Sequence, residues 1–206
     1  EAALKDFRKN DLDWRDGRVF AYVYDPGKEA EAVIKHAYME YLSENGLDPT
    51  VFPSTLRMEN DVIAMCVSHL RGGDAAQGSF TSGGTESCIL SMKTARDHGR
   101  SVRGIKEPEV IVPTTAHAAF HKGAHYLDMK LVVVPVDPVT FKADVAATRA
   151  AINENTVMLV GSAVSYAHGV CDPIPELGAL ALEKGLLLHV DGCIGAFVLP
   201  LWRKLG

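Results

Sequence analysis

The sequence predicts an α/β fold, in which a mostly parallel sheet is covered by helices on both faces. Short apolar runs alternate along the chain with segments whose apolar residues recur every three or four positions. The apolar runs are continuous, as expected of strands that are buried on both faces. Strands and amphipathic helices in alternation are typical of a parallel sheet with right-handed crossovers.

Residues 1–71 are predicted to form an N-terminal helical segment. Residues 1–16 are polar and helical or irregular, whereas residues 18–24 are aromatic and β-branched, which suits a short extended segment. Asp25-Pro26-Gly27 then predicts a turn. Two helices follow over residues 28–43 and 53–70, with Asn45-Gly46 ending the first and Arg71-Gly72-Gly73 ending the second.

Residues 72–206 are predicted to form the front part of the α/β domain. Strands are predicted over residues 109–113, 131–136, 156–161 and 186–190, and helices over residues 84–98, 116–127, 141–153 and 173–184. Ligands of such sheets bind at the carboxyl ends of the strands. The informative polar residues therefore follow the strands: Thr114, Thr115, His117, Ser162, His168, Asp191 and Cys193.

The composition of the chain argues against several classes of protein. A net charge of −5 without any basic run argues against nucleic-acid binding. The four cysteines form no CxxC pair or zinc-type cluster, so neither a metal site nor a disulfide framework is expected. Reduced thiols favour a cytoplasmic location. No apolar run is long enough to span a membrane, and residues 1–6 resemble neither a signal peptide nor a mitochondrial presequence.

The loop over residues 78–87 has the pattern of a phosphate-binding loop. Gly83 and Gly84 let the backbone approach an anion closely, and they lie where a helix is predicted to begin, with its unpaired N–H groups. Ser82, Thr85 and Ser87 add hydroxyl donors. The glycine spacing fits neither a dinucleotide motif nor a Walker loop, which favours a single phosphate group, as in pyridoxal phosphate. The alternative is a glycine-rich turn that caps an ordinary helix.

Asp191 and His117 are the candidate partners of the cofactor ring. Asp191 ends an apolar strand, where a carboxylate is costly unless a cation pairs with it, and a pyridinium N–H would supply that cation. The alternative is an aspartate that caps the next turn through Gly192. His117 has small neighbours that leave room for a flat ring to stack. It could equally cap or pack against its own helix.

Six segments together resemble a known family, and they span nearly the whole chain. They are residues 17–24, Phe52-Pro53-Ser54, residues 81–87, residues 113–120, residues 161–174 and His189-Val190-Asp191-Gly192-Cys193. In order and spacing the chain is similar to the sphingosine-1-phosphate lyases, within the pyridoxal-phosphate-dependent group II decarboxylases. The resemblance implies the large domain of the fold-type I, aspartate-aminotransferase-like enzymes, and homodimers with shared active sites.

The resemblance also implies a role for individual residues. Gly84 and Thr85 would hold the cofactor phosphate, His117 would stack on the ring, and Asp191 would pair with its nitrogen. The remaining residues are Tyr24, which with His117 would transfer protons, Asn45 and His168 near the substrate, and Ser162 in the cofactor pocket. The implied reaction is the retro-aldol cleavage of sphingosine or sphinganine 1-phosphate, which yields a long-chain aldehyde and ethanolamine phosphate.

Two features depart from the family pattern. Asp48 stands where the lyases usually carry a histidine, and its carboxylate would repel a substrate phosphate. The lysine that would attach the cofactor is expected beyond Gly206, together with the small C-terminal domain. The chain is therefore expected to be the front part of an enzyme, either truncated or partly resolved, and inactive by itself.

Three alternative functions remain open. An amino-acid decarboxylase of the same family would use the same Gly84, His117 and Asp191, although the His117-Ala118-Ala119-Phe120 run favours the lyase. A non-catalytic fragment could bind the cofactor or dimerise without chemistry. A nucleotide-binding α/β domain is the weakest alternative, because the glycine spacing does not fit it.

Overall fold

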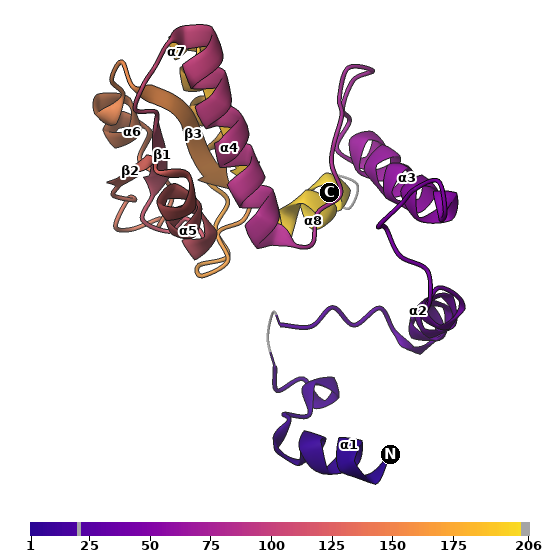
Figure 1. The fold of residues 1–206 in the computed structure, drawn as a ribbon. Helices are drawn as coiled ribbons and strands as arrows, with labels where there is room; N and C mark the ends of the chain where they lie inside the picture. Colours follow the sequence, from indigo (N-terminus) through magenta and orange to yellow (C-terminus); the bar gives the residue numbers. More distant parts are fainter. Residues whose placement is uncertain (20–21, 203–206) are drawn as a thin grey trace. The chain divides into compact units, whose positions relative to one another are not determined.

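A computed structural model describes residues 1–19 and 22–202 of the chain (Figure 1). The chain divides into two compact units, Glu1–Met58 and Glu59–Gly206, and each is described by itself. The boundary predicted at residue 71 stays a prediction.

The unit Glu1–Met58 consists of short helices that are exposed to solvent. They are α1 (Ala2–Phe7), the 3-10 helices η1 (Arg8–Asn10) and η2 (Trp14–Asp16), α2 (Lys28–Glu40) and the start of α3 (Pro53–His69), up to Met58. Arg15 connects η2 to α2, because its Nη2 lies 2.7 Å from Oε1 of Glu31. No described residue of this unit is buried. It therefore has no hydrophobic core of its own.

Helix α2 ends earlier than predicted, and the sequence Asn45-Gly46 does not end it. The helix ends at Glu40, and the backbone N–H of Tyr41 donates to the carbonyl oxygens of Ala37 and Met39 in its last turn. Asn45 instead forms a local turn, in which its Oδ1 accepts from the N–H of Leu47 at 3.0 Å. The predicted turn before α2 is confirmed, because Asp25 Oδ1 accepts from the N–H of Gly27 at 3.0 Å. In the predicted extended segment, residues 20–21 lie outside the described residues.

The sheet in Glu59–Gly206 has four parallel strands in the order β2-β1-β3-β4. They are β1 (Glu109–Pro113), β2 (Lys130–Val134), β3 (Thr156–Ser162) and β4 (Leu187–Asp191), each within two residues of its predicted bounds. Because all four strands run the same way, their carboxyl ends meet at one edge. The predicted parallel α/β architecture is confirmed.

Helices cover both faces of this sheet (Figure 1). They are α4 (Gly84–Arg103) and α5 (Ala118–Leu127) on one face, and α6 (Val145–Ala151) and α7 (Ile174–Lys184) on the other. Side chains along β1 alternate between two cores: Val110 and Val112 pack in the cluster of α4 and α5, and Ile111 packs in that of α6 and α7. The continuous apolar strands thus reflect burial on both sides.

A bulge between β1 and β3 places a side chain where α4 packs against the sheet. Glu109 pairs with Thr156 but Val110 pairs with Met158, so Val157 is the extra residue. Val157 packs in the core on the side of α4, where a Cβ built on Gly99 would lie 2.5 Å from its Cγ1. Helix α4 can approach the strand only because residue 99 has no side chain.

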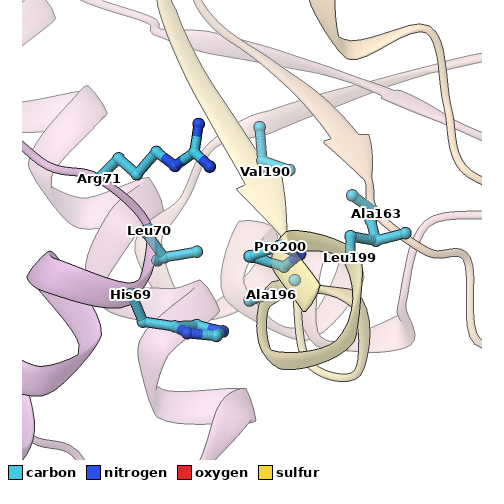
Figure 2. Close-up of a pocket in the computed structure, with 9 residues that line it drawn as sticks. His69, Leu70, Arg71, Ala163, Val190, Ala196, Leu199 and Pro200 are labelled. Atoms are coloured by element: carbon cyan, nitrogen blue, oxygen red, sulfur yellow. The ribbon is translucent and has the colours of Figure 1, made fainter. Parts of the chain in front are cut away.

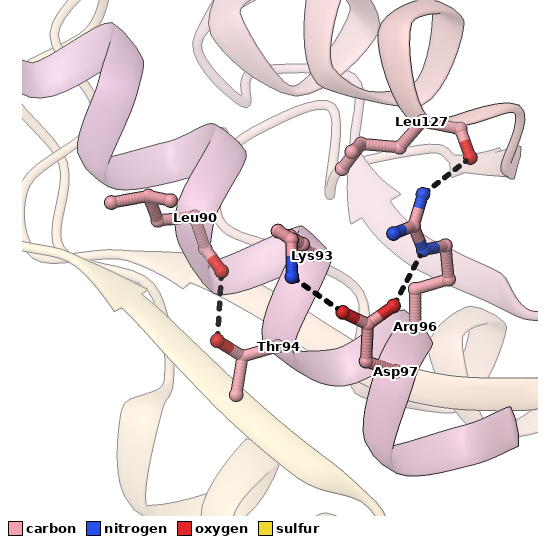
Figure 3. Close-up of polar contacts among 6 residues, drawn as sticks. All are labelled: Leu90, Lys93, Thr94, Arg96, Asp97 and Leu127. Carbon is pink, nitrogen blue, oxygen red and sulfur yellow. Dashed lines mark hydrogen bonds and ion pairs between the residues drawn. The ribbon is translucent and has the colours of Figure 1, made fainter. Parts of the chain in front are cut away.

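A polar contact joins α4 to α5, and others run along α4 itself (Figure 3). Arg96 donates from Nη1 to the carbonyl oxygen of Leu127 at 3.3 Å, at the end of α5. Its Nε lies 2.9 Å from Asp97 Oδ1, and Lys93 Nζ lies 2.6 Å from the other oxygen of that carboxylate. Helix α4 continues five residues past its predicted end, until Gly104 adopts a φ of 68°.

The other helices differ from the prediction mainly where a side chain caps them. Asp144 Oδ1 accepts from the N–H of Ala147 at 2.9 Å, so α6 begins after Asp144 and not at residue 141. Helix α3 (Pro53–His69) matches its prediction within one residue. Helix α8 (Gly195–Trp202) was not predicted, since its apolar residues follow no amphipathic period and Pro200 interrupts it.

Candidate active site

A cavity of about 450 Å³ opens at the carboxyl edge of the sheet. Its walls come from the start of α4, the turn after β1 and the end of β4. The lining residues are Gly84, Thr85, Ser87, Cys88, His117, His189, Val190, Asp191, Gly192 and Cys193. Four residues predicted from the sequence, Gly84, Thr85, His117 and Asp191, are thus brought to one place.

The start of α4 offers unpaired donors to this cavity. The N–H of Ser87 donates to the carbonyl of Gly83 at 3.1 Å, so the N–H groups before it have no acceptor in the helix. A Cβ built on Gly84 would meet no atom within 4 Å, so the space beside this residue is open. An anion placed there would receive backbone donors and the positive end of the helix dipole.

Side chains of the loop hold it in shape. Glu86 Oε2 accepts from the N–H of Ser82 at 2.7 Å and from its hydroxyl at 2.6 Å, and these bonds lower the pKa of Glu86. The hydroxyls of Thr81 and Ser87 lie 2.7 Å apart. The hydroxyls of Ser82 and Ser87, which were expected to face an anion, are therefore engaged within the loop.

His117 caps α5 and at the same time lines the cavity. Its Nδ1 accepts from the N–H of Ala119 at 3.0 Å, which fixes the ring and assigns the proton to Nε2 when the ring is neutral. The ring of Tyr166 meets it edge-on, with centroids 5.2 Å apart. The capping alternative is observed, and it is compatible with a ring that also faces a ligand.

Asp191 ends β4 at the wall of the cavity. Its Oδ1 accepts from the N–H of Cys193 at 3.2 Å, so this aspartate does form the local turn considered as the alternative. A carboxylate has acceptor sites on both oxygens, so one weak backbone bond leaves capacity for a ligand. The turn holds the carboxylate in place without satisfying it.

Cys88 and His189 form uncharged walls of the cavity, and no sequence pattern predicted a role for them. Burial raises the pKa of the Cys88 thiol to about 11, with further contributions from Asp191 and Cys193. Burial lowers the pKa of His189, which Asp191 partly offsets, and its ring packs edge-on against Phe120 at 5.5 Å. Cys88 could have been found from its place one helical turn after Gly84.

Ser162 and His168 are not among the residues that line the cavity. Ser162 is buried, and its backbone N–H donates to Asp172 Oδ2 at 2.7 Å. It pairs with Asp191 in the β3–β4 ladder. His168 stacks on Phe141, with ring centroids 4.9 Å apart, in the loop after β3. The predicted pocket roles of both stay predictions.

Tyr24 and Asn45 belong to the unit Glu1–Met58, where Tyr24 is exposed. Asp48 lies in the same unit and accepts from the hydroxyl and the N–H of Thr50, at 2.7 and 2.8 Å. These hydrogen bonds lower the pKa of Asp48, so its carboxylate is ionised at neutral pH. The roles of Tyr24 and Asn45 stay predictions.

A second cavity, of about 350 Å³, lies between the end of α3, the end of β4 and α8 (Figure 2). It is lined by His69, Leu70, Arg71, Ala163, Val190, Gly192, Ala196, Leu199 and Pro200. His69 is held by α8, since its Nε2 lies 3.2 Å from the carbonyl oxygen of Phe197 and the two rings stack. The lining includes no carboxylate, so the first cavity is the better candidate for an active site.

Residues 1–19 and 22–202 were also considered as a metal site and as membrane-spanning segments. They contain no group of three or more histidine, cysteine or acidic side chains that could hold a metal ion. Within those same residues, every helix is too short or too polar to cross a membrane.

Comparisons with known proteins identify the family of the chain. Residues 67–201 match the family Aminotransferase class-V. The sphingosine-1-phosphate lyase of Arabidopsis thaliana is 44% identical over 98% of this chain and 38% of its own length. The solved structure of the Burkholderia pseudomallei sphingosine-1-phosphate lyase superposes with a TM-score of 0.90 at 40% identity, covering 100% of this chain and 48% of that one.

A further relative carries a different name. The Probable L-tyrosine/L-aspartate decarboxylase of Methanothermobacter thermautotrophicus is 36% identical over 84% of this chain and 46% of its own length. The chain spans between a third and a half of the length of these relatives. The resemblance to the lyases is confirmed by the identities. By the family match over residues 67–201, the chain belongs to the class-V aminotransferase family.

Proposed function

We propose that this chain is the cofactor-binding part of a pyridoxal-phosphate-dependent carbon–carbon lyase. Its substrate is sphingosine or sphinganine 1-phosphate, and its products are a long-chain aldehyde and ethanolamine phosphate. One observation carries the proposal: the donors at the start of α4, the ring of His117 and the carboxylate of Asp191 all line one cavity. Identity of 44% to a lyase of that name supports the choice of substrate.

The residues of the cavity suit pyridoxal phosphate. A volume of about 450 Å³ is in the usual range for small-molecule sites. The open space beside Gly84 has room for a phosphate where a side chain would block it. When bound, the cofactor supplies an electron sink for the carbanion that carbon–carbon cleavage produces. Gly84 and Thr85 bind its phosphate in this proposal.

With the cofactor bound, Asp191 would keep the ring nitrogen protonated, because its carboxylate would accept the N–H of that nitrogen. The bond from Cys193 N–H orients the carboxylate beforehand. Cys88 and His189 are uncharged near neutral pH and keep this part of the cavity weakly polar. An ion pair is stronger in such surroundings than in water.

His117 orients the ring through its position at the start of α5. The Nδ1 atom of the His117 imidazole accepts from the N–H of Ala119, so the imidazole cannot turn freely about its Cβ–Cγ bond. Nε2 is then the atom that can hold or move a proton. Tyr24 remains the second proton-transfer candidate, and Asn45 and His168 remain the candidates for substrate binding. The ionised Asp48 would repel a phosphate at its own position.

We further propose a cytoplasmic homodimer with shared active sites. Exposed apolar side chains on α2, such as Val33, Ile34 and Tyr38, are 57–73% accessible in a unit without a core. Apolar surface of this extent is typical of residues that pack against a partner. Four free cysteines suit a reducing compartment. The division into a helical segment, residues 1–71, and a cofactor domain from residue 72 is part of the proposal.

The test is a product assay on the intact protein that contains this chain. Sphinganine 1-phosphate should yield a long-chain aldehyde, whereas L-tyrosine, L-aspartate and L-glutamate should release no carbon dioxide. Asp191→Asn should lose aldehyde formation, and Gly178→Ala, on α7, should keep it. If an amino acid released carbon dioxide and the sphingoid base yielded no aldehyde, the protein would be a decarboxylase and not a lyase.

That decarboxylase is the second candidate function, favoured by the 36% identity to a protein so named. It would use the same cavity and break the bond to a carboxylate. A fragment without catalytic activity is distinguished by absorbance: a shifted cofactor band that borohydride traps indicates covalent attachment, and the spectrum of free cofactor indicates binding alone.

A further inference from the structure

Asp172 is a buried carboxylate whose two oxygens both bind backbone groups. Only 3% of the residue is accessible to solvent. Oδ1 accepts from the N–H of Ala143 and Oδ2 accepts from the N–H of Ser162, each at 2.7 Å. A carboxylate is buried at a high cost, which charge-assisted hydrogen bonds of this length offset.

The two donors come from segments that are far apart in sequence. Ala143 ends the connection between β2 and α6, and Ser162 is the last residue of β3. The N–H of Asp172 also donates back to the carbonyl of Ser162 at 2.9 Å. Ser162 is therefore bound on both its backbone groups by one residue, much as a neighbouring strand would bind it.

The same end of β3 holds Asp191. Ser162 and Asp191 are paired residues of the β3–β4 ladder, and the N–H of Ala163 donates to the carbonyl of Asp191 at 2.8 Å. A Cβ on Gly161 would lie within 3.7 Å of the side chains of Leu177, Ile174 and Asp172, so the strand cannot shift toward α7. The backbone of Asp191 is thus joined through Ser162 and Ala163 to the bonds that Asp172 makes.

From these contacts we propose that Asp172 is a positioning residue for the cofactor site. It fixes Ser162, and through Ser162 and Ala163 it fixes where the carboxylate of Asp191 lies in the cavity. This inference rests on the proposed function. It adds a residue that does not touch the cofactor yet sets the geometry of the group that pairs with the ring nitrogen.

The experiment compares two isosteric substitutions in the intact protein. Asp172→Asn places an amide NH₂ against a backbone N–H, so one of the two bonds is lost and the end of β3 relaxes. Glu109→Gln is the matched control. Glu109 is 5% accessible and binds Lys130 and Asn153, at the amino edge of the sheet.

Four quantities are measured: the melting temperature without cofactor, the hydrogen-exchange rate of the Ser162 amide, the dissociation constant of pyridoxal phosphate, and the ¹⁵N chemical shift of its ring nitrogen. We expect Asp172→Asn to weaken cofactor binding about tenfold and to move the ring nitrogen toward its neutral shift. Faster hydrogen exchange of the Ser162 amide in the cofactor-free protein should accompany these changes. Glu109→Gln should lower the melting temperature alone.

The inference is overturned if both variants change the dissociation constant of pyridoxal phosphate equally for the same loss in melting temperature. It is also overturned if Asp172→Asn leaves the ring nitrogen of the cofactor protonated as in the wild type. Should Asp172→Asn not fold, Asp172→Glu keeps the charge and displaces it by one methylene. The same shift in ring protonation is then expected, and its absence is equally decisive. A wild-type protein that does not protonate the ring nitrogen contradicts the proposed function itself.

Discussion

The amino and carboxyl edges of the sheet, where the parallel strands begin and end, differ in how their polar groups are paired. At the amino edge, Glu109 binds Lys130 at 2.6 Å and Asn153 at 2.8 Å. Arg103 donates to the carbonyl of Thr156 at 2.9 Å, and the hydroxyl of Thr156 accepts from the N–H of Asn153 at 3.0 Å. These groups pair with one another.

At the carboxyl edge, hydrogen-bonding capacity is left unused. The hydroxyls of Thr115 and Ser165 are buried without a partner among the described residues. The first N–H groups of α4 have no acceptor within the helix, and Asp191 accepts one backbone bond at 3.2 Å. Since buried polar groups are normally paired, the unmet groups at this edge support the proposed ligand site.

Both edges of the sheet are rich in polar residues, so the presence of polar residues does not show which edge holds the functional site. Charge and burial alone would favour Glu109, which is more buried than Asp191. What distinguishes the edges is whether the partners of each group are already present. Substitutions at the amino edge should therefore change stability, and substitutions at the carboxyl edge should change binding.

The largest effect is expected for Gly84→Val. The space beside Gly84 is open, so the fold should be kept, but the new side chain occupies the proposed phosphate position. The dissociation constant of pyridoxal phosphate for the intact protein should rise about a hundredfold, as several charge-assisted bonds are lost. An absorbance titration measures this. Gly178→Ala, whose Cβ meets only Leu188, is the control, and binding of normal affinity by Gly84→Val would contradict the proposed cradle.

A moderate effect on stability alone is expected for Glu109→Gln. Burial acts to raise the pKa of Glu109, but the bonds from Lys130 and Asn153 lower it overall, so the folded protein holds the carboxylate. An amide at this position replaces one accepting oxygen by a donor. The free energy of unfolding should fall by about 1 kcal/mol, or about 3 °C in melting temperature. Scanning calorimetry measures it, and a loss of cofactor binding would break the contrast between the edges.

The smallest effect is the pH dependence that His189 gives to stability. Burial lowers the pKa of His189 in the folded state, so the unfolded chain takes up a proton there first. The contribution to stability is complete above a pH of about 6.5 and declines as the pH falls through the lowered value. The drop in melting temperature from pH 7.5 to 5.5 should be smaller in His189→Gln than in the wild type. An identical drop would mean that other groups cause it.

The sheet could be predicted closely from the sequence because its strands are continuous apolar runs between clear helices. The helix boundaries were less accurate where a side chain decides them. Asp144 and His117 each accept a backbone N–H and so set the first residue of α6 and of α5. Helix α2 ends before Asn45-Gly46 because its C-terminal bonds close at Tyr41.

Within the candidate site, residues on the loop and at the strand ends were predictable, since parallel strands bring their carboxyl ends together. Cys88, His189 and Tyr166 were not predicted, because their chemistry here depends on burial and ring contacts that arise only from packing. The part played by Asp172 lies in two backbone bonds across distant segments, which no local pattern indicates.

The bulge at Val157 has a consequence for natural variation at residue 99. A methyl group added to Gly99 would overlap the valine, and both residues lie away from the cavity. In a library that samples every codon at both positions, alanine at 99 should survive selection only beside a smaller residue at 157. Residues 99 and 157 would then covary although neither takes part in catalysis. A coevolution map would report this packing contact between α4 and β3.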